Sequence, residues 1–159
     1  MAIKDGPDKL IGSILVLCTQ NAVRSPMLEA MLKYVFGACV FVQSAGVEGS
    51  QVNPFAVNVM GEVSLDISDH NSVSYHDITP NSYDLIIALS RPAYELAKKI
   101  ACDQALEIEY WTMPEPPTAM QGNREQMLDN FRRIRDDLKL HLENRFQIAL
   151  QMEHDKTKT

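Results

Sequence analysis

The sequence predicts an α/β fold, a three-layer sandwich in which a four-stranded parallel β-sheet carries helices on both faces. Short apolar runs alternate with segments of helical periodicity along most of the chain, which is typical of βαβ units. The run at residues 83–89 is almost continuously apolar, as expected for a strand buried on both faces. Ligands of such sheets bind beyond the carboxyl ends of the strands, so we expect a functional site in the loops that follow them.

The elements have recognisable starts and stops. Gly37 ends the first helix, Pro54 fits the first turn of the second, and Asn123 with Gln126 three positions later forms a capping box for the last. Apolar spacing continues through that helix to Phe146. The predicted strands are residues 13–17, 39–46, 83–89 and 106–110, and the predicted helices are residues 25–36, 54–63, 91–101 and 123–146.

Length and composition restrict the class of protein. The chain has 159 residues, enough for one domain, which we place at residues 13–150 between a flexible lead-in (1–12) and a disordered tail (151–159). The net charge of −6 argues against partners such as nucleic acid or a membrane surface. Three cysteines and no long apolar segment favour free thiols in a reducing compartment. We therefore expect a cytoplasmic protein, monomeric or weakly dimeric.

The loop after the first strand holds the clearest chemical signal. Cys18 opens it, Arg24 closes it six residues later, and Pro26 begins a helix. Backbone N–H groups at a helix start form an anion site and favour the thiolate form of a cysteine there. An arginine can bind two anionic oxygens at once, and Ser25 can donate to the thiolate, to a bound phosphate or to the helix end. The loop therefore predicts covalent attack on a phosphoryl-like centre.

From about Ser13 to Leu142 the chain resembles the low-molecular-weight protein tyrosine phosphatase family, which includes thioredoxin-linked arsenate reductases of the same fold. The family motif C-x5-R-S is matched by Cys18, Arg24 and Ser25. Further matches are Asn21 and Pro26 in the loop, Ser44-Ala45-Gly46, His70, the strand at 83–89 and Pro114-Glu115-Pro116. The resemblance implies a flavodoxin-like sheet with strand order 2-1-3-4.

The resemblance also implies roles for individual residues. Cys18 would be the nucleophile, Arg24 would hold phosphate oxygens, and Glu115 would be the general acid. Asn21, supported by His70, would hold a left-handed loop conformation, and Ser25 would stabilise the thiolate. Phosphate would lie among the groups of Thr19, Gln20, Asn21, Ala22, Val23, Arg24 and Ser25, with no metal and no cofactor.

Several positions depart from the family pattern. Gln20 replaces a glycine, Val23 replaces a second loop cysteine, and Glu115 replaces an aspartate. Ser90 occupies the position of an aspartate that braces the site, and we expect it to be a supporting residue. The aromatic residues that follow the acid in phosphotyrosine enzymes are missing, which weakens the case for a phosphotyrosine substrate.

Three functions are compatible with these residues. The first is metal-independent hydrolysis of a phosphorylated protein or small phosphomonoester through a phosphocysteine on Cys18, with inorganic phosphate or sulfate as a ligand of the loop. The second is a catalytically weakened phosphate- or phosphoprotein-binding domain. The third is arsenate reduction with an external thiol, because residues 88–100 hold no cysteine for an internal relay. The spacing of His70, His76, Asp69 and Asp77 matches no metal-ligand pattern.

Overall fold

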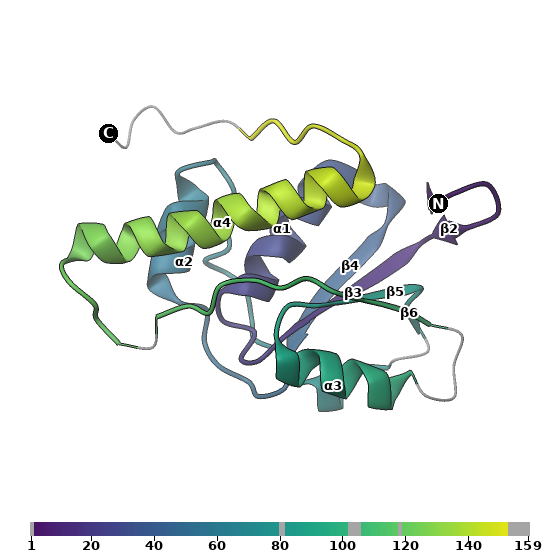
Figure 1. Cartoon of the computed structure of the whole chain (residues 1–159), viewed down its shortest axis with the longest axis horizontal. Coiled ribbons are helices and arrows are strands. Elements are labelled where there is room, and N and C mark those ends of the chain that lie inside the picture. The colour runs from purple at the N-terminus through teal and green to yellow at the C-terminus, as the bar shows by residue number, and fades with distance from the viewer. Residues whose placement is uncertain (1, 80–81, 102–105, 118, 153–159) are drawn as a thin grey trace.

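The computed structural model describes residues 2–79, 82–101, 106–117 and 119–152, which form three layers (Figure 1). The central sheet has four parallel strands: β3 (Ser13–Cys18), β4 (Phe41–Gly46), β5 (Leu85–Ala88) and β6 (Glu107–Tyr110). Their spatial order is β4-β3-β5-β6, the predicted order of second, first, third and fourth strand. The α/β class and this strand order are therefore confirmed.

Helices lie on both faces of the sheet. One face is covered by α1 (Arg24–Phe36), α2 (Pro54–Gly61) and α4 (Arg124–Phe146), and the other by α3 (Arg91–Ile100), as Figure 1 shows. Short 3-10 helices are found at η1 (Gly37–Cys39) and η2 (Tyr75–Asp77). None of the helices in the described part of the chain combines the length and apolar character needed to cross a membrane.

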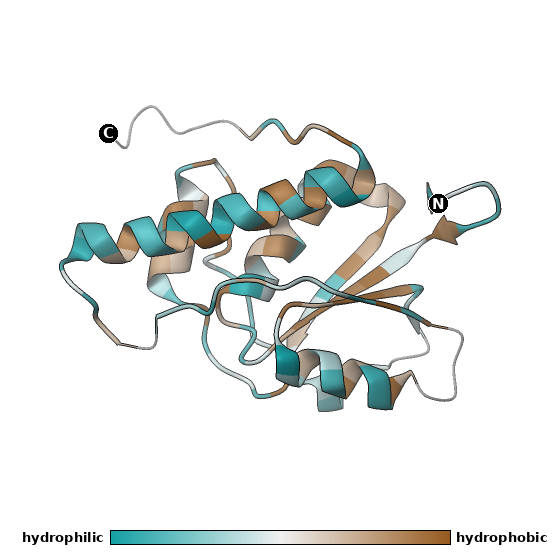
Figure 2. Cartoon of the chain, viewed as in Figure 1, coloured by the Kyte–Doolittle hydropathy of each residue, from teal (hydrophilic) through white to brown (hydrophobic). Residues whose placement is uncertain are grey.

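The central strands are buried on both faces because their side chains alternate between two cores. In β3, Ile14 and Val16 belong to the core beneath α1, α2 and α4, whereas Leu15 and Leu17 belong to the core beneath α3. Figure 2 shows the resulting contrast between mostly hydrophobic strands and the mixed surface of α4. A period of two with both sets of side chains apolar is the pattern expected of an internal parallel strand.

The capping box of the last helix is present. The Gln126 N–H donates to Asn123 Oδ1 at 2.9 Å, and the Asn123 N–H donates to Gln126 Oε1 at 2.8 Å. Phe131 is fully buried and stacks on Phe55 with ring centroids 5.4 Å apart. The apolar stripe predicted for this helix therefore faces the core.

Two segments near the N-terminus and after α1 differ from expectation. Residues expected to be a flexible lead-in form an antiparallel hairpin of β1 (Ile3–Lys4) and β2 (Leu10–Ile11). Arg145 donates to both carboxylate oxygens of Asp5 at 2.9 Å, and these bonds hold the pKa of Asp5 below its usual value. The second strand was predicted to begin at residue 39, which is wrong: Gly37 has φ +53° and begins a 3-10 turn that leaves Cys39 exposed, and β4 begins at Phe41.

A buried ion-pair network fastens α4 to α2. The side chain of Arg135 is only 6 % exposed, and it donates to the carbonyl of Val59 at 2.8 Å and to Glu62 Oε1 at 2.9 Å. Arg132 also donates to both carboxylate oxygens of Glu62, from Nε to Oε1 at 3.0 Å and from Nη2 to Oε2 at 2.7 Å. Hydrogen bonds from Arg132 and then Arg135 outweigh desolvation and lower the pKa of Glu62.

Glu62→Gln is expected to lower the free energy of unfolding at pH 7 by about 2 kcal/mol, because it leaves the buried Arg135 with only the exposed Asp136 as an anionic partner. A carboxyl whose folded pKa is depressed stabilises the fold above its unfolded pKa, and this contribution is lost as the pH falls through the folded pKa. Urea unfolding should therefore show the difference shrinking from pH 7 to about pH 3.

The control is Glu125→Gln. Glu125 is another carboxylate partner of Arg132, and its side chain is 68 % exposed. A solvated pair of this kind is worth less than about 1 kcal/mol. Equal losses for the two variants at pH 7 would contradict the account of the buried network.

Candidate active site

The loop between β3 and α1 lies at the carboxyl edge of the sheet. Cys18 is the last residue of β3, is 3 % exposed and pairs in register with Gly46 of β4. Helix α1 begins at Arg24, and its N-cap, Val23, offers no side-chain hydrogen bond. Ser25 therefore lies inside the first turn and is not the N-cap. An uncapped helix start leaves its N–H groups and its dipole to a bound anion.

The thiol of Cys18 lies within a set of hydrogen bonds. The Asn21 N–H donates to Cys18 Sγ at 3.1 Å, and Ser25 Oγ lies 2.8 Å from the same sulfur. Both groups can donate a hydrogen bond to a thiolate. The arrangement therefore supports a nucleophilic sulfur at the base of the loop.

Asn21 holds the loop in a conformation that few residues adopt. Its φ is +55°, in the left-handed region where asparagine is enriched. Its Nδ2 donates to Ser25 Oγ at 2.7 Å and to Ser44 Oγ at 2.9 Å. Its Oδ1 accepts from the Val73 N–H at 2.9 Å and lies 2.9 Å from Nε2 of His70. The structure thus places His70 against Asn21, as the resemblance implied.

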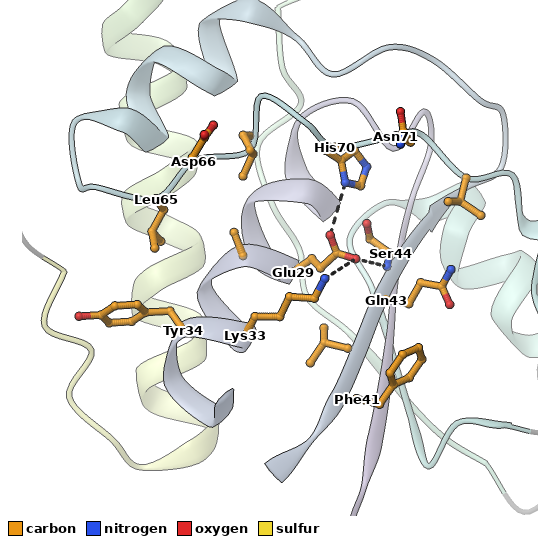
Figure 3. A pocket seen from close by; sticks show the side chains of 14 residues that line it. Glu29, Lys33, Tyr34, Phe41, Gln43, Ser44, Leu65, Asp66, His70 and Asn71 are labelled. Atoms are coloured by element: carbon orange, nitrogen blue, oxygen red, sulfur yellow. Dashed lines mark hydrogen bonds and ion pairs between the residues drawn. The ribbon is translucent and has the colours of Figure 1, made fainter. Parts of the chain in front are cut away.

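A second layer of polar groups holds His70. Glu29 of α1 lies 3.4 Å from His70 Nδ1 and accepts the Ser44 N–H at 2.9 Å (Figure 3). These side chains line a hollow of about 690 Å³ beside the β4 edge. Neither Cys18 nor Arg24 contributes to its lining, so the hollow lies behind the loop and outside its anion site. Glu29 was missed by sequence reasoning, because only the fold brings it to His70.

His70→Ala is expected to reduce kcat/KM of any reaction at Cys18 by about tenfold, because a loosened Asn21 displaces the N–H groups of the loop. His70→Gln, which can still donate to Asn21 Oδ1, should recover most of the loss. His76→Ala is the control, because His76 is exposed and its ring contacts only Tyr75 among the described rings. Steady-state kinetics with equal losses for His70→Ala and His76→Ala would refute a positioning role.

Gly46 is required where β4 meets the loop. A Cβ on Gly46 would lie 2.5 Å from the carbonyl oxygen of Glu48 and 2.8 Å from the Asn21 nitrogen, closer than real Cβ atoms come. The segment after Gly46 then holds the loop through its backbone: the Val47 N–H donates to the Cys18 carbonyl and the Asn53 N–H to that of Ala22. The matching Ser44-Ala45-Gly46 run therefore has a steric basis.

Arg24 and Gln20 complete the loop. Arg24 is 6 % exposed, and its Nη1 donates to the Leu89 carbonyl at 3.1 Å, which orients the guanidinium along the cavity wall. Gln20 replaces the family glycine, but among the described loop residues the positive φ belongs to Asn21 and not to Gln20. The exposed Gln20 therefore needs none of the conformational freedom of glycine.

Ser90, which follows β5 and caps α3, connects the loop to this part of the sheet. Its Oγ accepts from Thr19 Oγ1 at 3.0 Å and from the Ala93 N–H at 3.2 Å, where it caps α3. A hydroxyl at this position therefore braces the backbone next to Cys18 without adding a negative charge.

The loop opens into a cavity of about 400 Å³. Glu115 lies in its wall, so the structure brings the three predicted catalytic side chains to one cavity. The described residues contain no cluster of three or more histidine, cysteine, aspartate or glutamate side chains suited to a metal ion. Sequence reasoning missed Ser50, Gln51 and Asn53, since loops carry little pattern. The cavity is lined by Cys18, Thr19, Gln20, Ala22, Val23, Arg24, Ser50, Gln51, Asn53, Glu115, Pro116 and Pro117.

A buried thiol and a guanidinium lie together at an uncapped helix start on the carboxyl edge of a parallel sheet, an arrangement suited to an oxyanion. The family model described as low molecular weight phosphotyrosine protein phosphatase matches residues 13–156. The chain belongs to this enzyme family.

Proteins similar to this chain are named either arsenate reductases or tyrosine phosphatases. An arsenate reductase of Shouchella clausii is 36% identical over 126 residues, which cover 79% of this chain and 88% of the relative. A solved arsenate reductase in the phosphate binding state is 28% identical, with a TM-score of 0.66 and coverage of 87% of this chain and 99% of its own. A tyrosine phosphatase of Erwinia amylovora has a TM-score of 0.70 at 21% identity over 90% of this chain and 93% of its own, and shows the shared fold alone.

Proposed function

We propose that the chain is a metal-independent phosphomonoesterase that works through a phosphocysteine on Cys18. The observation that carries the proposal is the environment of Cys18 Sγ, which lies 3.1 Å from the Asn21 N–H and 2.8 Å from Ser25 Oγ in a cavity shared with Arg24 and Glu115. The N–H groups of the loop and the guanidinium supply the positive charge that a phosphoryl group needs.

In the first step, the Cys18 thiolate attacks phosphorus in line with the ester oxygen. The S–P bond forms while the P–O bond breaks, and the Glu115 carboxyl gives its proton to the departing alkoxide. The equatorial oxygens are bound by loop N–H groups and by Arg24. The products of this step are an alcohol, a phosphocysteine and a Glu115 carboxylate.

In the second step, a water molecule attacks the phosphocysteine. The Glu115 carboxylate takes the proton of the water, the S–P bond breaks, and inorganic phosphate leaves. Ser25 stabilises the departing sulfur, because its hydroxyl is 2.8 Å from Sγ and can donate to the thiolate that forms. The cycle therefore returns every group to its starting protonation state.

Arsenate reduction is the second candidate, favoured by the curated relatives named arsenate reductase, such as that of Shouchella clausii. Cys18 would displace water from arsenate and form an S–As bond. Two thiols must then supply two electrons as arsenic is reduced and a disulfide forms. Residues 88–100 hold no cysteine and Val23 occupies the second loop position, so at least one thiol would be external.

The test uses the intact protein with EDTA and is run across about pH 5 to 7. We expect turnover of p-nitrophenyl phosphate, and no arsenate-dependent consumption of glutathione or mycothiol at a comparable rate. Thiol consumption without phosphate release would favour the reductase. Oxyanion binding with neither activity would leave the weakened binding domain as the function.

A further inference from the structure

The cavity around Cys18 has walls of a particular chemistry. Its lining includes the amide and hydroxyl side chains of Gln20, Ser50, Gln51 and Asn53, together with Glu115 and two prolines. None of the lining residues in the described part of the chain has an aromatic ring. A site of this kind can offer several hydrogen bonds to a leaving group but no ring on which an aryl group could stack.

The aromatic residues nearest in sequence to Asn53 and Glu115 pack elsewhere. Phe55, two positions after Asn53, stacks on Phe131 in the core at 5.4 Å. Trp111, four positions before Glu115, is 6 % exposed and stacks on His141 at 5.6 Å. Neither ring lines the cavity, so turning one of them toward a substrate would remove it from an existing stack.

We infer that the natural substrate is a small hydroxyl-rich phosphomonoester of the sugar phosphate class, and not a phosphotyrosine protein. The inference rests on the proposed function. The volume of about 400 Å³ is within the usual range of small-molecule sites, about 300–1,000 Å³. The leaving-group hydroxyls would be bound by Gln20, by Gln51 and by Nδ2 of Asn53, whose Oδ1 accepts the Phe55 N–H at 2.8 Å as the cap of α2. The alkoxide would take its proton from Glu115.

Leaving-group chemistry agrees with this substrate class. An aliphatic alkoxide is more basic than a phenoxide and needs protonation as it leaves. Glutamate extends one methylene further than the aspartate of the family, and Glu115 lies in the same cavity as Cys18. A site that binds substrate hydroxyls discriminates strongly against analogues without them, because its polar groups are then left unpaired.

The test compares kcat/KM for glucose 6-phosphate, a phosphoserine peptide and a phosphotyrosine peptide, with p-nitrophenyl phosphate as the reference for basic activity. We expect glucose 6-phosphate to exceed both peptides by at least about tenfold. A preference for either peptide overturns the substrate class while leaving the proposed function intact. Failure to hydrolyse any compound, p-nitrophenyl phosphate included, overturns both.

One variant tests the wall directly. Gln51→Tyr places a ring in the cavity and should raise the kcat/KM ratio of phosphotyrosine peptide to glucose 6-phosphate by about two- to tenfold. Gln121→Tyr is the matched control, because Gln121 is exposed and outside the cavity lining. Equal ratios in the two variants would overturn the assignment of Gln51 to the leaving group.

Discussion

Cys18→Ser is expected to lower kcat for p-nitrophenyl phosphate by at least about 10⁴-fold, the largest effect in this protein. A serine hydroxyl is a far weaker nucleophile than a thiolate. The groups around Cys18 Sγ, the Asn21 N–H and the Ser25 hydroxyl, can stabilise an anion but include no base that would deprotonate serine. Steady-state kinetics at about pH 5 to 7 measure the loss.

Binding should survive this substitution. The oxyanion groups are loop N–H groups and Arg24, so Cys18→Ser should still be stabilised against heat by inorganic phosphate. Cys39→Ser is the matched control, because Cys39 is exposed on the turn after α1 and should keep full activity. A Cys18→Ser variant that retains a tenth of the activity would exclude covalent catalysis by Cys18.

Arg24→Lys is expected to lower kcat/KM by about 10²- to 10³-fold. Lysine keeps the charge but loses the planar fork that binds two oxygens of one phosphoryl group. It also cannot reproduce the guanidinium geometry in which Nη1 donates to the Leu89 carbonyl at 3.1 Å. The loss should appear mainly in kcat, because the charge on the phosphoryl oxygens is best matched in the transition state.

Arg91→Lys provides the comparison for Arg24→Lys. Arg91 lies at the start of α3, is largely exposed and pairs with Glu95 on the same helix. Its replacement should change kcat/KM by less than about twofold, because the pair is solvated. If Arg24→Lys were as active as Arg91→Lys, the guanidinium would have no part in phosphoryl transfer.

The fold was predictable because its information is local. Apolar runs such as residues 83–89 indicate buried strands. Capping residues such as Asn123, with its partner Gln126, indicate where a helix begins. The right-handed crossover rule then limits how such units can be arranged. The loop that brings Cys18 and Arg24 to one cavity was predictable for the same reason, since the two residues are close in sequence.

Long-range contacts could not be predicted in this way. Arg145 binds Asp5 from the far end of the chain, and this bond holds the unexpected N-terminal hairpin against α4. Glu29 belongs to α1, and its sequence neighbours do not indicate that His70 Nδ1 will lie 3.4 Å from its carboxylate. Contacts of this kind depend on the packing of whole elements, which residue spacing does not encode.

The backbone of the loop lies between these cases. Gln20 replaces the family glycine, and a glycine can adopt a positive φ that glutamine rarely adopts. In the structure Asn21 has the positive φ and Gln20 does not, and the bonds to Ser44 and Val73 that hold Asn21 come from distant segments. The sequence therefore shows that Gln20 replaces a glycine, but it does not show which loop residue has the positive φ.

Rapid-quench mass spectrometry of the intact protein during turnover of p-nitrophenyl phosphate tests the central claim most directly. We predict a species heavier by one phosphoryl group, with the added mass on the peptide that contains Cys18 and none on the peptide that contains Cys39. The species should appear as fast as the burst of p-nitrophenol. Turnover with no phosphorylated Cys18 at any quench time would contradict the account.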